Sequence, residues 1–350
     1  MGQRRQGFRR QSRLKLVFRI FPIAALHAFR SAAKPWALAI CATVCATTAL
    51  SQDYPSRPVR LVVGFGAGGG TDILARIVAP PLGESLGQAV VVENRPGAGG
   101  TIAAHQVATA PADGYTAFLL NNGHAVSAAM YKALPYDPAA DFQPVTMLAT
   151  MPLVVVAGPK APYADLPALI AGAKQSPGKL NFASVGVGST QQFAGVLLLQ
   201  LAGANLVHVP YKGTPNAIAA IQSGEAHLLV EVAASVLGQV RGGALKALAV
   251  TSARRFPILP DVPTVAEAGI AGYDVTTWYA LAFPAKTPAP VVARLNAGVR
   301  TVLQRDEVRK QLANAAFVPE TSTPEALAAH LRAEIARWSA VREKAGIEQQ

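Results

Sequence analysis

Short apolar runs alternate with amphipathic runs along most of the chain between residues 59 and 281. Between several of the apolar runs, polar and apolar positions follow the helical period, which predicts helices over Ala164–Gln175, Thr190–Leu201 and Thr214–Ser223. Alternation of this kind predicts an α/β fold with mainly parallel sheets. The apolar runs are rich in β-branched residues and bounded by turn residues, and they predict strands at Val59–Val63, Val90–Glu93, Thr116–Leu120, Leu153–Ala157, Leu180–Ala183, Leu206–Val209, Ala226–Val230 and Leu245–Thr251.

The C-terminal part, from Pro288 onward, predicts helices only, most clearly over Val291–Gln304 and Pro324–Ala345. Several predicted helix starts are marked by side chains that can cap a helix. Capping boxes are predicted at Thr264–Glu267 and at Ser322–Glu325. Thr214-Pro215 predicts an N-cap followed by proline at the first helical position.

The first 51 residues have the pattern of a secretory signal. They carry nine lysine or arginine residues and no acidic residue, followed by a small apolar stretch at Trp36–Leu50. Ala49 and Ser51 place small residues at the positions expected for cleavage after Ser51. The apolar stretch is shorter than the roughly 20 residues of a membrane span, so we expect export with cleavage, and a retained membrane anchor is the alternative.

Removal of this segment changes both the charge and the cysteine content. The whole chain has 32 basic and 20 acidic residues, and the mature part keeps 23 basic residues against the same 20 acidic ones. Its small net charge, with no basic stripe interleaved with aromatics, does not predict nucleic-acid binding. Both cysteines, Cys41 and Cys45, precede residue 52, so the mature chain has no disulfide, thiolate nucleophile or cysteine metal site. Lipid attachment at either is disfavoured by the large preceding residues Ile40 and Val44.

Two loops of small residues join a predicted strand to a predicted helix. The first, Gly64–Gly70, is followed by Thr71 and Asp72, and the second covers Ser184–Thr190. Helix N-termini carry unpaired N–H groups and a partial positive charge, and glycine allows a ligand to approach the backbone closely. Because ligands bind beyond the carboxyl ends of strands and often between domains, the two loops predict two α/β halves that face one cleft.

The first loop also supports a different function. Gly64, Gly66 and Gly69 match the glycine pattern of dinucleotide-binding folds, and Glu93 ends the next strand, where such folds place their ribose-binding acid. An exported oxidoreductase that depends on a dinucleotide is therefore an alternative, although the export signal argues against it. A loop that only turns tightly is the other alternative.

Two titratable residues follow predicted strands and so lie at the ligand end of the sheets. His124 is expected either to donate a hydrogen bond to a ligand or to be structural. Glu231 is expected either to select a cationic or hydroxyl group or to be a solvated strand end. Arg95 lies in the glycine loop Asn94–Thr101, which we interpret as a tight connection with Arg95 as a structural donor.

The sequence has no recognisable catalytic set. The pattern Gly-x-Ser-x-Gly and the Walker loop are missing, and no pair of acids recommends acid–base catalysis. The histidines at positions 105, 208, 227 and 330 have no metal-ligand spacing, so no metal or cofactor is expected. An exported α/β protein with two ligand loops is better explained as a receptor than as an enzyme.

Several motifs together carry a resemblance to a known family over residues 52–347. The chain resembles the tripartite tricarboxylate transporter solute receptors, the Bordetella uptake gene (Bug) family. The resemblance implies a type II periplasmic binding protein fold, with domain 1 at residues 52–152 plus 277–350, domain 2 at 153–276, and a ligand cleft between them. The motifs are Tyr54–Arg60, Gly68–Asp72, Val91–Gly100, Ala112–Thr116, Leu134–Pro138, Pro177–Asn181, Val207–Gly213, Leu248–Ser252 and Leu259–Val265.

The resemblance also implies a function and a ligand site. Such receptors capture a small carboxylate (a dicarboxylate or tricarboxylate, an aromatic carboxylate or an acidic amino acid) and deliver it to transporter membrane subunits; we expect a monomer. A periplasmic sensor subunit that presents its ligand to a signalling partner is an alternative. Implied ligand-binding residues are Phe65, Gly66, Ala67, Gly68, Gly69, Gly70, Thr71 and Asp72 in the first loop, Asn122, Gly123 and His124 beside it, Ser184, Gly188, Ser189 and Thr190 in the second loop, and Tyr211, Glu231 and Tyr279, with Lys212 nearby. Trp278 and Tyr279 are expected to line the mouth of the cleft.

The chain departs from the family pattern in three places. Gly64-Phe65-Gly66 stands where the family often has proline around the phenylalanine, which predicts a more flexible loop. Pro80-Pro81 falls inside the first helix and predicts a kink or break. Leu229–Ala234 is less polar than usual, so an aromatic carboxylate is as plausible a ligand as a citrate-like one.

Overall fold

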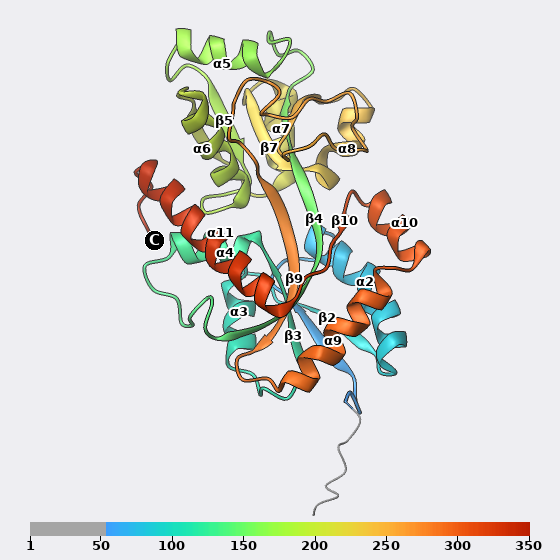
Figure 1. The fold of residues 1–350 in the computed structure, drawn as a ribbon. Coiled ribbons are helices and arrows are strands. Elements are labelled where there is room, and N and C mark those ends of the chain that lie inside the picture. Colours follow the sequence, from blue (N-terminus) through green and yellow to red (C-terminus); the bar gives the residue numbers. More distant parts are fainter. Residues whose placement is uncertain (1–53) are drawn as a thin grey trace, which may run out of the picture. The chain divides into compact units, whose positions relative to one another are not determined.

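The computed structural model describes residues 54–350, so the predicted signal segment lies outside the described residues. Helices and strands alternate as the sequence pattern predicts (Figure 1). The strands are β1 (Val59–Val63), β2 (Val90–Asn94), β3 (Thr116–Asn121), β4 (Phe142–Ala157), β5 (Asn181–Ser184), β6 (Val207–Pro210), β7 (Leu228–Val232), β8 (Lys246–Val250), β9 (Thr276–Pro284) and β10 (Val318–Pro319). The helices are α2 (Gly70–Leu86), η1 (Ala98–Gly100), α3 (Thr101–Ala108), α4 (Asn122–Met130), α5 (Leu166–Gln175), α6 (Thr190–Ala202), α7 (Thr214–Ser223), α8 (Ala233–Arg241), α9 (Ala289–Val302), α10 (Asp306–Asn314) and α11 (Pro324–Lys344).

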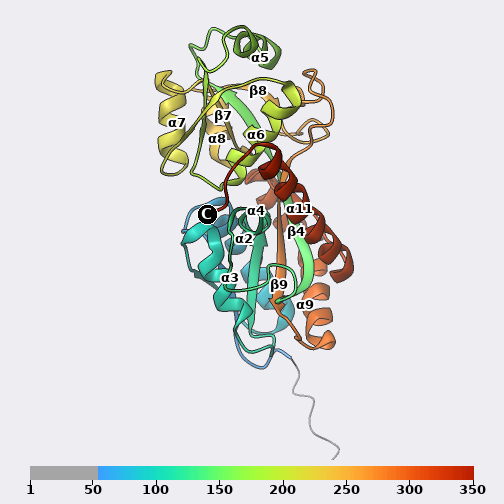
Figure 2. The same cartoon turned by 90° about the vertical axis from the view of Figure 1, so that its left-hand side faces the viewer.

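The strands form two sheets that share the long strand β4. In the first sheet the order is β2-β1-β3-β9-β4, with β10 on β4; in the second it is β4-β7-β5-β6, with β8 on β4. β4 pairs with β9 as far as Pro152 and with β7 from Leu153 onward. Figure 1 shows β4 and β9 running side by side between the two sheets, and Figure 2 shows α5, α6, α7 and α8 around the second sheet.

The sheets are mixed rather than mainly parallel. β1 is parallel to β2 and β3, and β5 is parallel to β6 and β7, as predicted. β4 and β9 are antiparallel to each other and to their neighbours, because they carry the chain between the sheets in opposite directions. The sequence analysis missed β9 and the Phe142–Pro152 part of β4, because polar and apolar residues do not alternate regularly in either segment.

Helix α2 passes through both prolines without a break, so the predicted break is wrong. Leu74, Val78 and Leu82 are buried along one face of α2, while Pro80 is exposed. The helix also packs closely against α9, where a Cβ on Gly298 would lie 3.1 Å from a Leu82 methyl group. Burial of this face outweighs the cost of about 3 kcal/mol that proline imposes inside a helix.

The C-terminal helices are confirmed as α9 and α11, with the two-residue strand β10 as the one exception to the helices-only prediction. The two hydrogen bonds of the capping box at Thr264–Glu267 form: Thr264 N donates to Glu267 Oε2 (2.8 Å) and Glu267 N to Thr264 Oγ1 (3.0 Å). The helix that this box was expected to start is wrong, because the residues after Thr264 form a turn.

The other two predicted N-caps are each wrong by one residue. Thr323, not Ser322, caps α11, because the Ser322 hydroxyl accepts a hydrogen bond from Met147 N on β4. Gly213, not Thr214, is the N-cap of α7. Among residues 54–350, no helix combines the length and the apolar character needed to cross a membrane.

Candidate functional site

A cavity of about 430 Å³ lies where the loops of both sheets meet. Its walls come from the loops that follow β1 and β3 in the first sheet and β5, β6 and β7 in the second, together with β9. These are carboxyl ends of strands, where α/β proteins bind ligands. The lining residues are Phe65, Gly69, Gly70, Thr71, Gly99, Asn121, Asn122, Gly123, Val185, Gly186, Val187, Gly188, Ser189, Thr190, Gln191, Gly213, Thr214, Glu231, Val232, Ser235, Thr277 and Tyr279.

Four helices begin in the wall of this cavity. The first residues of α2, α4, α6 and α7 (Gly70, Asn122, Thr190 and Thr214) all line it, and α8 begins one residue after the lining residue Val232. Each helix start offers N–H groups without an intrahelical partner and a partial positive charge. Among residues 54–350, no lysine, arginine or histidine lines the cavity. Its lining therefore suits an anion held by backbone N–H groups and neutral side chains.

Asp72 shapes the first loop instead of lining the cavity. Its carboxylate, which is 2% exposed, accepts hydrogen bonds from Gly68 N and Asn94 Nδ2 (both 2.9 Å) and pairs with Arg76 at 2.9 Å. Burial pushes the pKa of Asp72 upward, but these bonds outweigh burial and hold the pKa below its usual range. Asn94 also donates to Phe65 O at 3.0 Å. The sequence analysis missed Asn94, because nothing in its position at a strand end marks this bridging role.

The loop approaches its neighbours closely enough to need glycine. A Cβ on Gly64 would lie 2.9 Å from Gly100 Cα, closer than real Cβ atoms come, so this departure from the family pattern is matched to local packing. Asn121 joins the starts of α2 and α4. Its Oδ1 accepts from Gly123 N and its Nδ2 donates to Thr71 Oγ1, both at 3.0 Å.

The second loop is held from behind by a buried polar cluster. The Ser184 hydroxyl, fully buried, lies 2.7 Å from His208 Nε2, and Gln192 Nε2 lies 3.3 Å from His208 Nδ1. Gln192 Oε1 accepts from Gly188 N at 2.7 Å. Ser189 lines the cavity and also caps α6 by accepting from Gln192 N at 3.1 Å. Ser184 is therefore a support of the loop and not part of the cavity wall.

His124 lies outside the cavity, within an aromatic cluster. Its ring stacks on Tyr136 and meets Phe118 and Phe142 edge-on, and Nε2 lies 2.8 Å from Pro138 O. Burial lowers the pKa of His124 to about 4. The structural interpretation of this histidine fits these contacts, because a neutral, buried ring with a backbone partner has no face turned to the cavity.

The implied ligand residues divide into two groups. Those that line the cavity are Phe65, Gly69, Gly70, Thr71, Asn122, Gly123, Gly188, Ser189, Thr190, Glu231 and Tyr279. Those that do not line it are Gly66, Ala67, Gly68, Asp72, His124, Ser184 and Tyr211, with the nearby Lys212 and Trp278. Tyr211 instead donates to Glu225 Oε1 at 3.0 Å in an exposed hydrogen bond.

The lining residues that the sequence analysis missed are mostly neighbours of the ones it found. They are Gly99, Asn121, Val185, Gly186, Val187, Gln191, Gly213, Thr214, Val232, Ser235 and Thr277. Asn121 and Thr214 carry a usable signal, because each is a polar residue at a predicted strand end or helix start.

Within the part of the chain that the structure describes, Glu231 is the single charged residue in the cavity lining, and it is fully buried. The interpretation as a solvated strand end is therefore wrong. Its Oε1 accepts from Gln191 Nε2 and from Val232 N, both at 2.8 Å, whereas Oε2 has no hydrogen-bond partner. Burial raises the pKa of Glu231, and the hydrogen bonds from Gln191 and Val232 offset only part of that rise. Burial also raises the pKa of the neighbouring Tyr279 to about 12.

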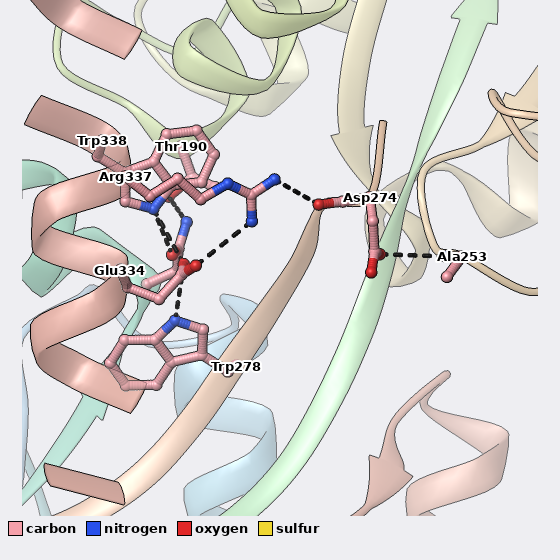
Figure 3. Close-up of polar contacts among 8 residues, drawn as sticks. Thr190, Ala253, Asp274, Trp278, Glu334, Arg337 and Trp338 are labelled. Atoms are coloured by element: carbon pink, nitrogen blue, oxygen red, sulfur yellow. Dashed lines mark hydrogen bonds and ion pairs between the residues drawn. The ribbon is translucent and has the colours of Figure 1, made fainter. Parts of the chain in front are cut away.

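Polar contacts link helix α11 to the cavity wall (Figure 3). Trp338 Nε1 donates to Asn122 Oδ1 and to Glu334 Oε2 (both 3.0 Å), and Asn122 Nδ2 donates to Thr190 Oγ1 (3.2 Å). The Asn122–Thr190 bond joins a helix of the first sheet to one of the second. Trp278 is 1% exposed and donates to Glu334 (3.2 Å), so its expected place at the cavity mouth is wrong. On β9, alternate side chains face opposite ways, and Tyr279 takes the cavity side.

A wider cavity, of about 940 Å³, runs along α9 and the start of α11. It lies against one sheet only and touches none of the loops that follow parallel strands, so the smaller cavity is the better candidate for a ligand site. No group of three or more potential metal ligands occurs within residues 54–350.

The fold and the cavity between two α/β sheets are those of periplasmic binding proteins. The chain superposes on the structure of the periplasmic binding protein BugD with a TM-score of 0.74 and 35% identity, over 85% of this chain and all of that one. It superposes on R. palustris Rpa4515 with adipate (TM-score 0.78, 36% identity, 85% and 100% covered) and on MatC from Rhodopseudomonas palustris with bound malate (0.73, 35%, 82% and 99%).

Residues 74–347 match the family described as "Tripartite tricarboxylate transporter family receptor", and the chain belongs to this family. Protein BugT of Bordetella pertussis is 36% identical over 298 residues, which cover 85% of this chain and 91% of BugT. A protein of Pseudomonas sp. strain P51, described as "UPF0065 protein in tcbD-tcbE intergenic region", is 38% identical over 303 residues, 86% of this chain and 90% of that protein.

This is a family of binding proteins and not of enzymes, so the oxidoreductase alternative is overturned. The geometry agrees with that outcome at Glu93. Its carboxylate pairs with Arg60 at 2.9 Å and with Arg95, which leaves it engaged by two cations instead of free to hold a ribose. Arg95 is the structural donor that the sequence analysis expected.

Proposed function

We propose that the protein is an exported receptor that captures a small carboxylate in the 430 Å³ cavity and delivers it to the membrane subunits of a tripartite tricarboxylate-type transporter. The observation that carries the proposal is the set of helix starts that line the cavity without any lysine, arginine or histidine. Relatives solved with adipate and with malate support a carboxylate as the ligand class.

In this proposal, the N–H groups at the starts of α2 and α4 hold a carboxylate of the ligand. The start of α6, with Ser189 and Thr190, closes on it from the second sheet. Hydrogen bonds from N–H groups to a charged acceptor are each worth about 1.5–3 kcal/mol, so a few of them hold a small anion without a buried counter-charge. Residues 52–152 with 277–350 and residues 153–276 would act as the two closing domains.

The location in the cell is part of the same proposal. The homologous structures are described as periplasmic, and residues 1–51 have the signal pattern. We infer cleavage near Ser51 and function of the mature chain, as a monomer, in the periplasm. Mass spectrometry of the exported protein would identify its first residue.

Calorimetry and thermal unfolding of the purified protein, refolded to remove bound ligand, test the function. The panel holds adipate, malate, citrate, benzoate, glutamate and a nicotinamide dinucleotide. A carboxylate at a hundred times its Kd should stabilise the protein by about 2.7 kcal/mol. Ser235→Trp fills the cavity and should abolish this gain, whereas Arg241→Trp, exposed on the same helix, should keep it. Stabilisation by the dinucleotide alone would refute the proposal.

A further inference from the structure

The inference concerns the chemistry of the ligand at its second-sheet end, and it rests on the proposed carboxylate-receptor function. The cavity already contains one carboxylate of the protein, that of Glu231, at the end of β7. This carboxylate sits beside the starts of α7 and α8: Val232 N, the N-cap of α8, donates to it, and Thr214, the first residue of α7, lies beside it. In its ionised form, Glu231 therefore places the protein's own anion at the starts of α7 and α8.

The remaining helix starts leave room for one further anion. Those of α2, α4 and α6 meet at the loops after β1, β3 and β5, and no acidic side chain other than Glu231 lines the cavity. Since no lysine or arginine lines it either, a second carboxylate on the ligand would find no cation and would approach Glu231. Like charges that share a site of low dielectric constant repel strongly.

The carboxyl group of Glu231 also lacks part of its hydrogen bonding. Of its two carboxyl oxygens, Oε1 accepts two hydrogen bonds and the buried Oε2 accepts none. A buried polar atom without a partner costs free energy that a bound donor would recover. The groups that face this carboxyl from the neighbouring elements are Gln191 on α6, Thr214 on α7 and Tyr279 on β9, and none of them carries a positive charge.

We propose that Glu231 makes the receptor selective for a ligand with a single carboxylate and a hydrogen-bond donor, a hydroxyl or an ammonium group, at its other end. The carboxylate of the ligand lies at the helix starts of the first sheet, and the donor of the ligand forms a hydrogen bond to Oε2 of Glu231. Dicarboxylates of the same length are rejected because their second carboxylate meets Glu231.

Two sets of ligands of matched length test this selectivity. The six-carbon set is 6-hydroxyhexanoate, 6-aminohexanoate, hexanoate and adipate, and the four-carbon set is 4-hydroxybutanoate, 4-aminobutanoate, butanoate and succinate. Titration calorimetry gives the Kd of each for the purified protein. In at least one set, the hydroxy or amino acid should bind at least tenfold more tightly than the dicarboxylate, which corresponds to about 1.4 kcal/mol.

Glu231→Gln is the decisive variant, because it keeps the shape of the side chain and removes its charge. The Gln side chain can donate to a carboxylate, so the tenfold preference should collapse, and the affinity for the amino acid should fall most. Glu225→Gln makes the same chemical change at an exposed position outside the cavity and should keep the preference. Thermal unfolding of both variants verifies that they fold.

The outcomes separate the two proposals. The proposed selectivity would be overturned if adipate or succinate bound more tightly than every hydroxy and amino acid, or if Glu231→Gln left the preference unchanged. Either result would leave the proposed receptor function standing. If no carboxylate in either set or in the wider panel binds, the receptor function itself fails.

Discussion

His124 should make the stability of the protein depend on pH in a defined window. The ring is buried among Phe118, Tyr136 and Phe142, and burial lowers its pKa from 6.5 to about 4. The unfolded chain takes up a proton on this histidine below pH 6.5, whereas the folded protein does so only near pH 4. The contribution of the neutral His124 to the unfolding free energy is therefore constant above pH 6.5 and is lost progressively as the pH falls towards 4.

The size of the effect follows from the width of this window. One pKa unit corresponds to 1.36 kcal/mol, so a shift of this size costs the folded state about 3 kcal/mol between pH 6.5 and pH 4. Carboxylates titrate in part of the same range, and a variant that changes only this histidine separates the two contributions. His124→Phe keeps an aromatic ring in the cluster and cannot be protonated.

Urea denaturation of the wild type and of His124→Phe at intervals from pH 8 to pH 4.5 measures the effect. The difference in unfolding free energy should stay constant above pH 6.5. Below it, the wild type should lose stability relative to the variant, by up to about 1.4 kcal/mol per pH unit. Overpacking by the phenylalanine changes the unfolding free energy of the variant equally at every pH, so it does not change how the difference from the wild type depends on pH. A difference that is independent of pH would refute the argument that His124 is buried and neutral.

Three further changes test the supports of the site and of the fold. Asp72→Ala should lower the unfolding free energy by about 1–3 kcal/mol and weaken carboxylate binding, because it leaves Gly68 N and Asn94 without their acceptor. Urea denaturation measures the stability and calorimetry the binding; unchanged binding would contradict the role of Asp72 in shaping the first loop. Pro80→Ala should raise the unfolding free energy by roughly 1–3 kcal/mol, seen as a higher urea midpoint, because the exposed proline lies inside α2; a lower midpoint would be the opposite of what we expect. Glu334→Leu should cost about 2 kcal/mol or more, because it leaves the buried Trp278 indole without its acceptor; a thermal midpoint equal to that of the wild type would show that this bond is dispensable.

The polar residues around the first loop show where sequence reasoning succeeded and where it failed. Glycine loops at strand ends predicted the region of the site, and Thr71, Gly123 and Ser189 lie in the cavity wall. Asp72 and Ser184, equally close in sequence, turn away to hold the loops. A polar side chain in a binding loop can serve the ligand or the loop, and its position along the chain does not distinguish the two.

The sequence by itself determined the elements that depend on local patterns. Periodicity predicts the parallel strands β1 and β5 and the helices α6 and α7. Polar groups three residues apart predict the paired hydrogen bonds of Thr264 and Glu267, although no helix follows them. The tertiary structure alone decided what depends on distant partners: the antiparallel course of β4 and β9, the passage of α2 through two prolines, and the burial of Glu231 beside the starts of α7 and α8. Burial against a distant element can outweigh the local conformational preference of a segment. The pattern of residues along the sequence does not show which distant element a segment will pack against.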